Sequence, residues 1–229
     1  NHLLELEKTK QATKYLKKLK ERDAIYFYYL GEIKRIEGLL EEASNIYHKA
    51  LNSLKKEDKL YPEILLKLAS VARSRGEIEQ AQRYLKMLKK IYPENKDFLL
   101  EMAMYLRMKG EFKKAVRYFS KLKKIYLKEK DYQALSYIEW AYGGIFRVKG
   151  SFKRSIESFK KAIEYAKKTQ DRSLLLYSKF GLAGVLRIYG KVKESYKEYL
   201  SCKRLIERDD YFSQGYYYCG IANALRQMG

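Results

Sequence analysis

The sequence predicts an all-α protein, an α-solenoid in which antiparallel helix pairs repeat along the chain. Three observations support this prediction. Apolar residues recur every three or four positions through most of the 229 residues, which is the period of an amphipathic helix. The chain contains only 2 Pro but is rich in Lys, Glu and Leu, which favour helices. A glycine also recurs at intervals of 34 to 40 residues, at Gly38, Gly76, Gly110, Gly150 and Gly190.

Each repeat is expected to place a first helix before its glycine and a second helix after it. Complete repeats are expected at residues 24–61, 62–95, 96–135, 136–175 and 176–214, within a single domain that spans residues 1–229. Residues 1–23 are expected to form the second helix of an incomplete repeat, and residues 215–229 the first helix of another. The expected parent is therefore a longer protein. Helix starts are expected at Pro62 and after the N-cap residues Asp131, Asp171 and Asp210, and Pro93 is expected in a loop.

Small and aromatic residues at set positions in these repeats resemble the tetratricopeptide repeat (TPR). The matching residues are Gly31, Gly38, Ala43, Tyr47 and Ala50, then Ala69, Gly76, Ala81 and Pro93, then Gly143, Phe152, Ser155, Phe159 and Ala162, and finally Ala183, Gly190, Ser195 and Tyr199. The period of about 40 residues is similar to the long-helix repeats of kinesin light chains and bacterial peptide-sensing regulators. The resemblance implies a right-handed superhelix whose first helices line a concave groove, where TPR proteins usually bind their partners.

One face of each first helix carries four residues at steps of three, four and three. In the second and third repeats these are Glu63, Leu66, Ser70, Arg73 and Asp97, Leu100, Met104, Arg107. The last of the four is arginine in every repeat: Arg35, Arg73, Arg107, Arg147, Arg187 and Arg226. Lys is the more common basic residue in the chain, so the guanidinium itself is favoured at this position. Two interpretations remain open, because no acidic residue recurs in the same register. The arginines could bind carboxylates or phosphates of a ligand, or they could support the fold by bonding to carbonyls, acids or Tyr hydroxyls.

The later repeats place glycines inside first helices, where each costs about 1 kcal/mol relative to Ala. These are Gly144, Gly181, Gly184 and Gly220. They could allow neighbouring helices to pack closely, or they could leave room for the backbone of a ligand. Aromatic residues surround them, and aromatic side chains beside arginine are typical of binding hot spots. We therefore expect the ligand-binding groove to include Tyr137, Trp140, Gly144, Tyr177, Phe180, Gly184, Tyr216 and Asn223 together with the six arginines. Asn223 is the one match to the asparagine of the TPR clamp for C-terminal carboxylates, so that class of partner is not expected.

Charge and motif content narrow the function. The formal net charge is +21, and lysines crowd the second helices, where we expect a solvated convex face typical of thermophilic proteins. The sequence has no phosphate-binding loop, zinc motif or membrane-spanning stretch, and only 2 His and 2 Cys, so no catalytic residue, metal or cofactor is expected. We expect a cytoplasmic, non-catalytic protein-interaction scaffold that binds an acidic or extended peptide. Binding of RNA or another polyanion, and a structural or self-association role, are the alternatives.

Overall fold

The computed structural model describes residues 2–19 and 21–229, so residues 1 and 20 of the first predicted segment lie outside the described residues. The described chain is helical throughout, which confirms the predicted all-α solenoid. The α-helices are α1 (His2–Leu16), α2 (Ala24–Ile36), α3 (Leu40–Asn52), α4 (Leu60–Ser74), α5 (Ile78–Ile91), α6 (Lys96–Met108), α7 (Phe112–Glu129), α8 (Tyr132–Val148), α9 (Phe152–Ala166), α10 (Arg172–Ile188), α11 (Val192–Cys202) and α12 (Tyr211–Met228).

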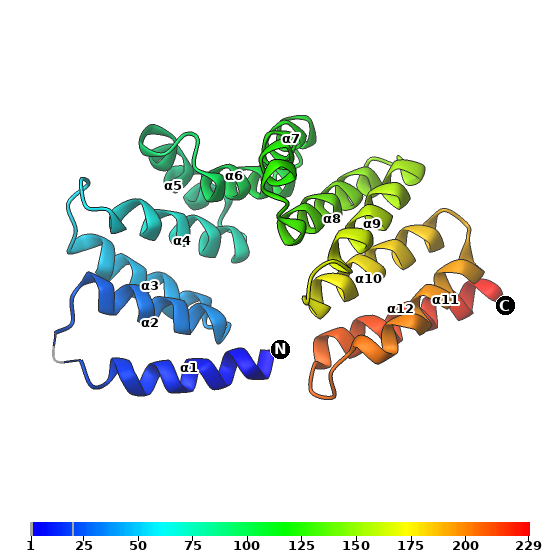
Figure 1. Ribbon diagram of the computed structural model, residues 1–229, viewed down its shortest axis with the longest axis horizontal. Coiled ribbons are helices and arrows are strands. Elements are labelled where there is room, and N and C mark those ends of the chain that lie inside the picture. Colours follow the sequence, from blue (N-terminus) through cyan, green and yellow to red (C-terminus); the bar gives the residue numbers. More distant parts are fainter. Residues whose placement is uncertain (1, 20) are drawn as a thin grey trace. The chain divides into compact units, whose positions relative to one another are not determined.

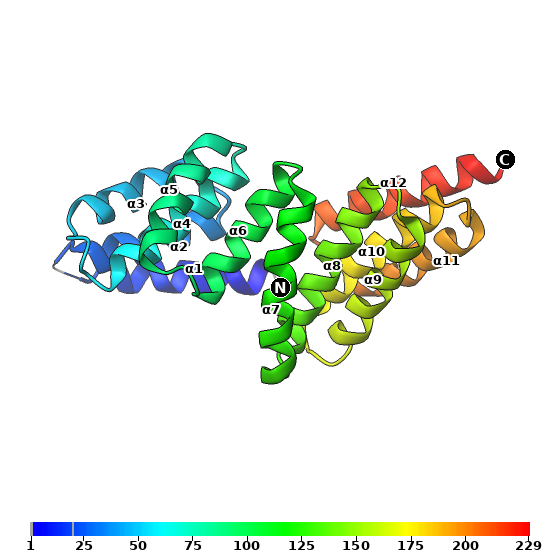
Figure 2. The same cartoon turned by 90° about the horizontal axis from the view of Figure 1, so that it is seen from above.

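The helices belong to two compact units, Asn1–Phe119 and Ser120–Gly229. The first unit contains α1 to α6 and the beginning of α7, and the second contains the rest of α7 and α8 to α12. Within each unit consecutive helices form antiparallel pairs, such as α2 with α3 and α10 with α11 (Figure 1). In the second unit the first helices α8, α10 and α12 also contact one another in sequence, and Figure 2 shows α8, α9 and α10 side by side.

The repeated glycines are turn residues between paired helices. Gly38 and Gly190 have φ angles of 81° and 88°, a conformation that residues with a side chain rarely adopt. The residue after each glycine closes the helix end, because its N–H donates to a carbonyl of the last turn. Leu39 donates to Lys34 and Lys191 donates to Leu186, both at 2.9 Å. The glycine period therefore marks the helix pairs, as the sequence predicts.

The predicted helix starts after Asp131, Asp171 and Asp210 are confirmed, whereas α4 begins at Leu60, two residues before Pro62. The side chains of Asp131, Asp171 and Asp210 each accept a hydrogen bond from the backbone of the helix that follows. Pro62 lies in the first turn of α4, and Pro93 lies in the connection between α5 and α6.

Close packing against a neighbouring helix explains Gly181 and Gly220, two of the four glycines singled out in the sequence, and also Gly143. A Cβ atom on Gly143 would come within 2.8 Å of the Phe159 ring, and one on Gly181 would overlap the same ring. A Cβ atom on Gly220 would overlap the ring of Tyr199. At these positions a side chain would collide with a buried aromatic ring. Gly184 is different, because the nearest atoms to its Cβ position are polar.

Candidate functional site

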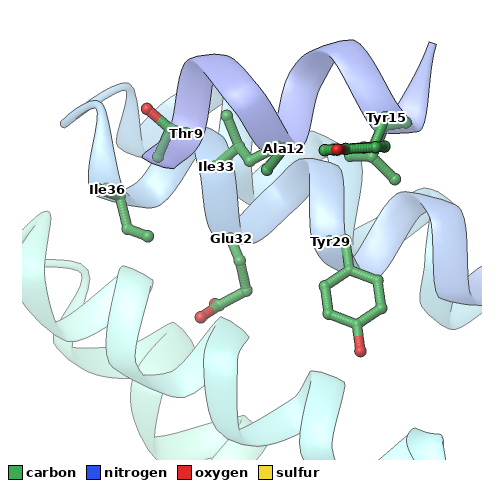
Figure 3. A pocket seen from close by; sticks show the side chains of 8 residues that line it. Thr9, Ala12, Tyr15, Tyr29, Glu32, Ile33 and Ile36 are labelled. Carbon is green, nitrogen blue, oxygen red and sulfur yellow. The ribbon is translucent and has the colours of Figure 1, made fainter. Parts of the chain in front are cut away.

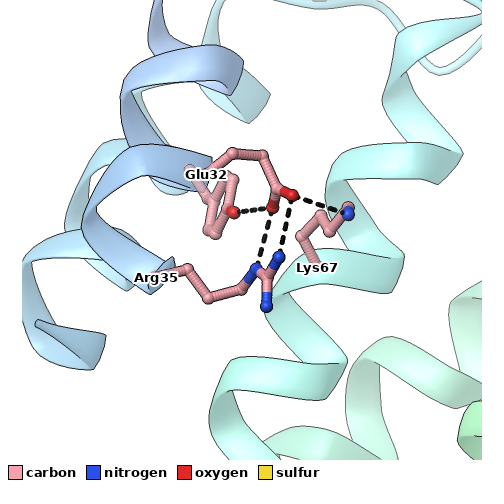
Figure 4. Close-up of polar contacts among 4 residues, drawn as sticks. Glu32, Arg35 and Lys67 are labelled. Atoms are coloured by element: carbon pink, nitrogen blue, oxygen red, sulfur yellow. Dashed lines mark hydrogen bonds and ion pairs between the residues drawn. The ribbon is translucent and has the colours of Figure 1, made fainter. Parts of the chain in front are cut away.

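Two of the three predicted arginines of the first unit, Arg35 and Arg73, are engaged by carboxylates of the protein itself. The carboxylate of Glu32 on α2 accepts hydrogen bonds from Nε and Nη2 of Arg35 at 3.1 and 3.0 Å (Figure 4). It also accepts one from Nζ of Lys67 on α4 at 3.0 Å and one from the hydroxyl of Tyr47 on α3. Burial raises the pKa of Glu32, but these hydrogen bonds outweigh it and lower the pKa to about 2. Glu32 therefore stays charged and holds three helices together.

A second pair joins α4 to α6. Nε and Nη2 of Arg73 donate to the two carboxylate oxygens of Glu101, the latter at 3.2 Å, and Glu101 is buried. Such a forked pair fixes the orientation of both side chains. Arg107 lies half-buried in the last turn of α6. Part of the predicted inner face, including Glu63 and Asp97, lines a polar recess of about 310 Å³ beside these pairs.

A larger cavity of about 500 Å³ lies between α1 and α2 (Figure 3). Its lining is almost entirely apolar: Thr9, Ala12, Tyr15, Leu16, Tyr29, Ile33 and Ile36, with Glu32 as the one charged residue. The carboxylate of Glu32 is already shared by Arg35 and Lys67 (Figure 4). The sequence did not predict this cavity.

In the second unit the first helices carry arginines but almost no acidic residues. Along α8, α10 and α12, which the structure describes in full, Glu139 is the only acidic residue. Glu139 is buried and accepts a hydrogen bond from Lys123 of α7. Within the described part of the chain, neither Arg147 on α8 nor Arg187 on α10 forms an ion pair with a carboxylate. Both arginines are half-buried, so each keeps a charge that no acid of the unit balances.

Arg147 and Tyr199 lie beside Gly184. A Cβ atom on Gly184 would lie 3.4 Å from Nη1 of Arg147 and 3.7 Å from the hydroxyl oxygen of Tyr199. Burial raises the pKa of Tyr199, and so does the neighbouring Tyr216, whereas the charges of Arg187 and Arg147 act in the opposite direction. A guanidinium from α8 and a hydroxyl from α11 therefore lie beside a position of α10 that carries no side chain, and the charge of Arg187 also acts on that hydroxyl.

Aromatic rings extend this face. The Phe180 ring is buried on α10 and lies 5.2 Å from the ring of Tyr216 and 6.4 Å from that of Tyr177. Tyr216 and Tyr177 are 46% and 37% exposed, so part of this aromatic surface meets solvent. On α8 the rings of Tyr137 and Trp140 stack at 5.6 Å.

The remaining predicted residues lie nearby in the same unit. Arg226 near the end of α12 donates to the Asn223 side chain at 3.1 Å, and Asn223 donates to the carbonyl of Cys219. Gly144 is half-buried on α8. The predicted groove residues are therefore divided between the two units. Arg35, Arg73 and Arg107 belong to the first unit, and the others belong to the second.

Sequence reasoning missed the acidic partners. No acid shares a register with the arginines, yet Glu32 and Glu101 reach Arg35 and Arg73 from different positions of their helices. It also missed a role for Tyr199, whose ring is buried and whose hydroxyl oxygen lies 3.7 Å from the Cβ position of Gly184. A signal was present, because Tyr47 and Tyr199 stand where the other complete repeats have Leu85, Phe119 and Phe159.

In residues 2–19 and 21–229, no three His, Cys, Asp or Glu side chains are placed to hold one metal ion. Among the helices described, none has the length and apolar character needed to cross a lipid bilayer.

Comparison with known proteins supports the repeat assignment. Residues 59–198, more than half of the chain, match the profile of the family described as Iml2/Tetratricopeptide repeat protein 39. No protein of curated function matches the sequence. A thermophilic TPR protein of Thermus thermophilus has a similar structure, with a TM-score of 0.69 and 16% identity over 87% of this chain and 99% of that one.

Two further solved structures are similar. A Rap protein complexed with competence and sporulation factor has a TM-score of 0.75 and 15% identity over 92% of this chain and 59% of its own. BtubC from P. vanneervenii has a TM-score of 0.65 and 17% identity over 89% of this chain and 90% of that one. At these identities the similarity establishes the fold alone.

Proposed function

The chain belongs to the Iml2/tetratricopeptide repeat protein 39 family, and on that basis we propose that it is a non-catalytic scaffold whose second unit binds an acidic, extended peptide segment. The TPR fold is in general a protein-interaction scaffold. The observation that carries the proposal is the pair of half-buried guanidiniums, Arg147 and Arg187, that no carboxylate of the unit balances.

Charge and surface chemistry favour an acidic partner. The net charge of +21 attracts acidic molecules over distances of about the Debye length, roughly 8–10 Å in physiological salt. Guanidinium groups bind carboxylates through two parallel hydrogen bonds, which Lys cannot imitate. The exposed rings of Tyr177 and Tyr216 add apolar contact for side chains that flank the acid. Arg35 and Arg73 serve the fold in this proposal, since Glu32 and Glu101 engage them.

RNA is the second candidate, and one observation favours it. A row of basic residues is exposed along α9 and just beyond it: Lys153, Arg154, Lys160, Lys161, Lys167 and Lys168. Such a row could contact successive phosphates. This surface differs from the one around Arg147 and Arg187, because its basic residues are mostly lysines and are not accompanied by an arginine pair and a tyrosine. Substitutions on one surface or the other can therefore distinguish peptide binding from RNA binding.

The test measures fluorescence anisotropy with two probes. One is a labelled peptide that alternates Glu with Leu and has an amidated C-terminus, with the corresponding Gln peptide as its control. The other is single-stranded oligouridine at low and high salt. We expect the Glu peptide to bind more tightly than the Gln peptide. Changing Arg147 and Arg187 together to Lys should weaken binding by about tenfold, because charge is kept but forked hydrogen bonds are lost.

Changing Lys160 and Lys161 together to Gln is the matched control, because it removes two exposed charges away from α8 and α10. It should leave peptide binding nearly unchanged. Unchanged peptide binding in the arginine variant, together with a large loss of melting temperature, would show that the arginines only support the fold. Tight, salt-dependent binding of oligouridine that depends on Lys160 and Lys161 would favour the RNA function instead.

A further inference from the structure

The two units contain the same arrangement of residues with one difference. In the first unit, Arg35 follows Glu32 by three residues and Tyr47 follows it by 15, and both donate to its carboxylate. In the second unit, Arg187 and Tyr199 follow Gly184 at the same two spacings. The donors are therefore repeated, but the residue that supplies the carboxylate in the first unit is a glycine in the second.

Donors also gather near both positions, although the cation of the neighbouring first helix comes from the following helix at Glu32 and from the preceding helix at Gly184. At Glu32, a guanidinium from the same helix, a hydroxyl from the paired helix and a cation from a neighbouring first helix, Lys67, surround one carboxylate. At Gly184, the hydroxyl of Tyr199 and Nη1 of Arg147, from the preceding first helix, lie 3.7 and 3.4 Å from the Cβ position. The charges of Arg187 and Arg147 both act on that hydroxyl.

We propose that Arg147, Arg187 and Tyr199, beside the side-chain-free position Gly184, form a receptor for one carboxylate of the bound peptide. The ligand would place its carboxylate where the first unit places that of Glu32. This inference rests on the proposed function, which it deepens by assigning the acid-binding subsite and its chemistry.

The other repeats show why this position is distinctive. Gly144 and Arg147 have the same spacing as Gly184 and Arg187, but the residue at the tyrosine spacing is Phe159, which has no hydroxyl. The Phe159 ring packs against Gly143 and Gly181 and fills that region with carbon atoms. At this position of the repeats, an arginine and a tyrosine therefore occur together at these two spacings twice, once after a glutamate and once after a glycine.

The donors beside this buried glycine suit a carboxylate. The atoms nearest to a Cβ on Gly184 are the ends of flexible side chains, not backbone, so they can adjust to an entering group. Carboxylate oxygens accept hydrogen bonds from guanidinium and hydroxyl groups, and the half-buried setting strengthens each of these bonds relative to water. Amides and ammonium groups match this donor set poorly, because the site presents cations and donors.

The decisive variant is Gly184→Glu, which supplies the missing carboxylate from within the chain. We expect NMR titration to find the pKa of the introduced carboxyl below about 3.5, as the lowered pKa of Glu32 leads one to expect. We also expect the variant to bind the Glu–Leu peptide about tenfold to a hundredfold more weakly than wild type, since one or two charged hydrogen bonds are no longer available to the ligand. Gly184→Ala is the control and should retain binding within about threefold, because it adds one methyl group and no charge.

The two readouts separate this inference from the proposed function. If wild type binds the peptide and Gly184→Glu binds equally well with an unshifted pKa, the subsite is wrong and the scaffold function stands. If the introduced carboxyl has a lowered pKa but wild type binds no acidic peptide, the carboxylate receptor is supported and the peptide-binding function is wrong.

A second variant keeps the inference testable if Gly184→Glu fails to fold. Tyr199→Phe removes only the hydroxyl and imitates Phe159 of the preceding repeat, so the variant should fold. It should bind the peptide several-fold more weakly, which corresponds to the loss of about one neutral hydrogen bond. Unchanged binding in Tyr199→Phe would overturn the assignment of this hydroxyl. The bound carboxylate could belong to a Glu side chain or to the C-terminus of the peptide. The two are distinguished by comparing the amidated Glu–Leu peptide with a Gln–Leu peptide whose C-terminal carboxylate is free. We expect the side-chain carboxylate of the amidated peptide to be sufficient, and preference for the free C-terminus would overturn that part.

Discussion

Replacing Glu32 by Gln removes the carboxylate that Arg35, Tyr47 and Lys67 share. Burial raises the pKa of Glu32, but the three donors lower it to about 2 from an ordinary value of 4.5. A difference of this size corresponds to at most about 3 kcal/mol of folding free energy. Because the Glu32 side chain is 19% exposed, solvent screening reduces the expected cost of the substitution to about 2 kcal/mol.

The stabilising effect of Glu32 should decrease as the pH falls. A carboxyl whose pKa is lowered by folding stabilises the protein fully above the unfolded pKa of 4.5 and loses that effect as the pH falls towards about 2. Urea unfolding followed by circular dichroism should therefore find Glu32→Gln less stable than wild type by about 2 kcal/mol at pH 7. The difference should be about half as large near pH 3, where the carboxyl is protonated in the unfolded chain but charged in the folded one.

Glu79→Gln is the matched control, because Glu79 is exposed on α5 and loses the same charge. It should change the free energy of unfolding by less than about 0.5 kcal/mol. The reasoning is refuted if the two variants are equally stable at pH 7. It is also refuted if the cost of Glu32→Gln does not shrink as the pH falls.

Two further predictions concern packing and thiol chemistry. Gly220→Ala should destabilise the second unit by about 1–3 kcal/mol, because its Cβ would overlap the Tyr199 ring. Gly215→Ala in the same helix meets nothing within 4 Å and should stabilise it by about 0.5–1 kcal/mol in thermal unfolding; equal melting temperatures would contradict the packing argument. Burial raises the pKa of Cys202 to about 12, whereas Cys219 is exposed. Ellman's reagent should therefore titrate one thiol in the folded protein at pH 8 and two in urea, and rapid reaction of both thiols without denaturant would contradict the structure.

The contrast between the units has a simple electrostatic origin. In the first unit the inner helices carry acids as well as arginines, and burial of a guanidinium is offset by a nearby carboxylate. In the second unit the inner helices carry almost no acid, so no carboxylate of these helices offsets the charges of Arg147 and Arg187. Neither arrangement is visible in the net charge of the chain.

Much of the fold could be predicted because its signals are local and periodic. The glycine turns, the caps at Asp131, Asp171 and Asp210 and the helix pairs depend on residues within one or two turns of each other. The packing role of Gly220 could be raised only as one of two interpretations, because the ring it contacts belongs to Tyr199 on the preceding helix.

By itself the sequence determined the repeat, the helix pairs and the arginine in each first helix, since these follow from period and spacing along the chain. Only the tertiary structure decided which arginines are already engaged. The partners of Glu32 lie 15 and 35 residues away in Tyr47 and Lys67, and Arg73 meets Glu101 across 28 residues. Such contacts depend on how neighbouring helices stack and on which side chains reach the same point. For the same reason, the sequence alone could not single out Gly184. Its lack of a carboxylate becomes notable only because the fold brings Arg147 and Tyr199 next to it and places Arg187 near that tyrosine.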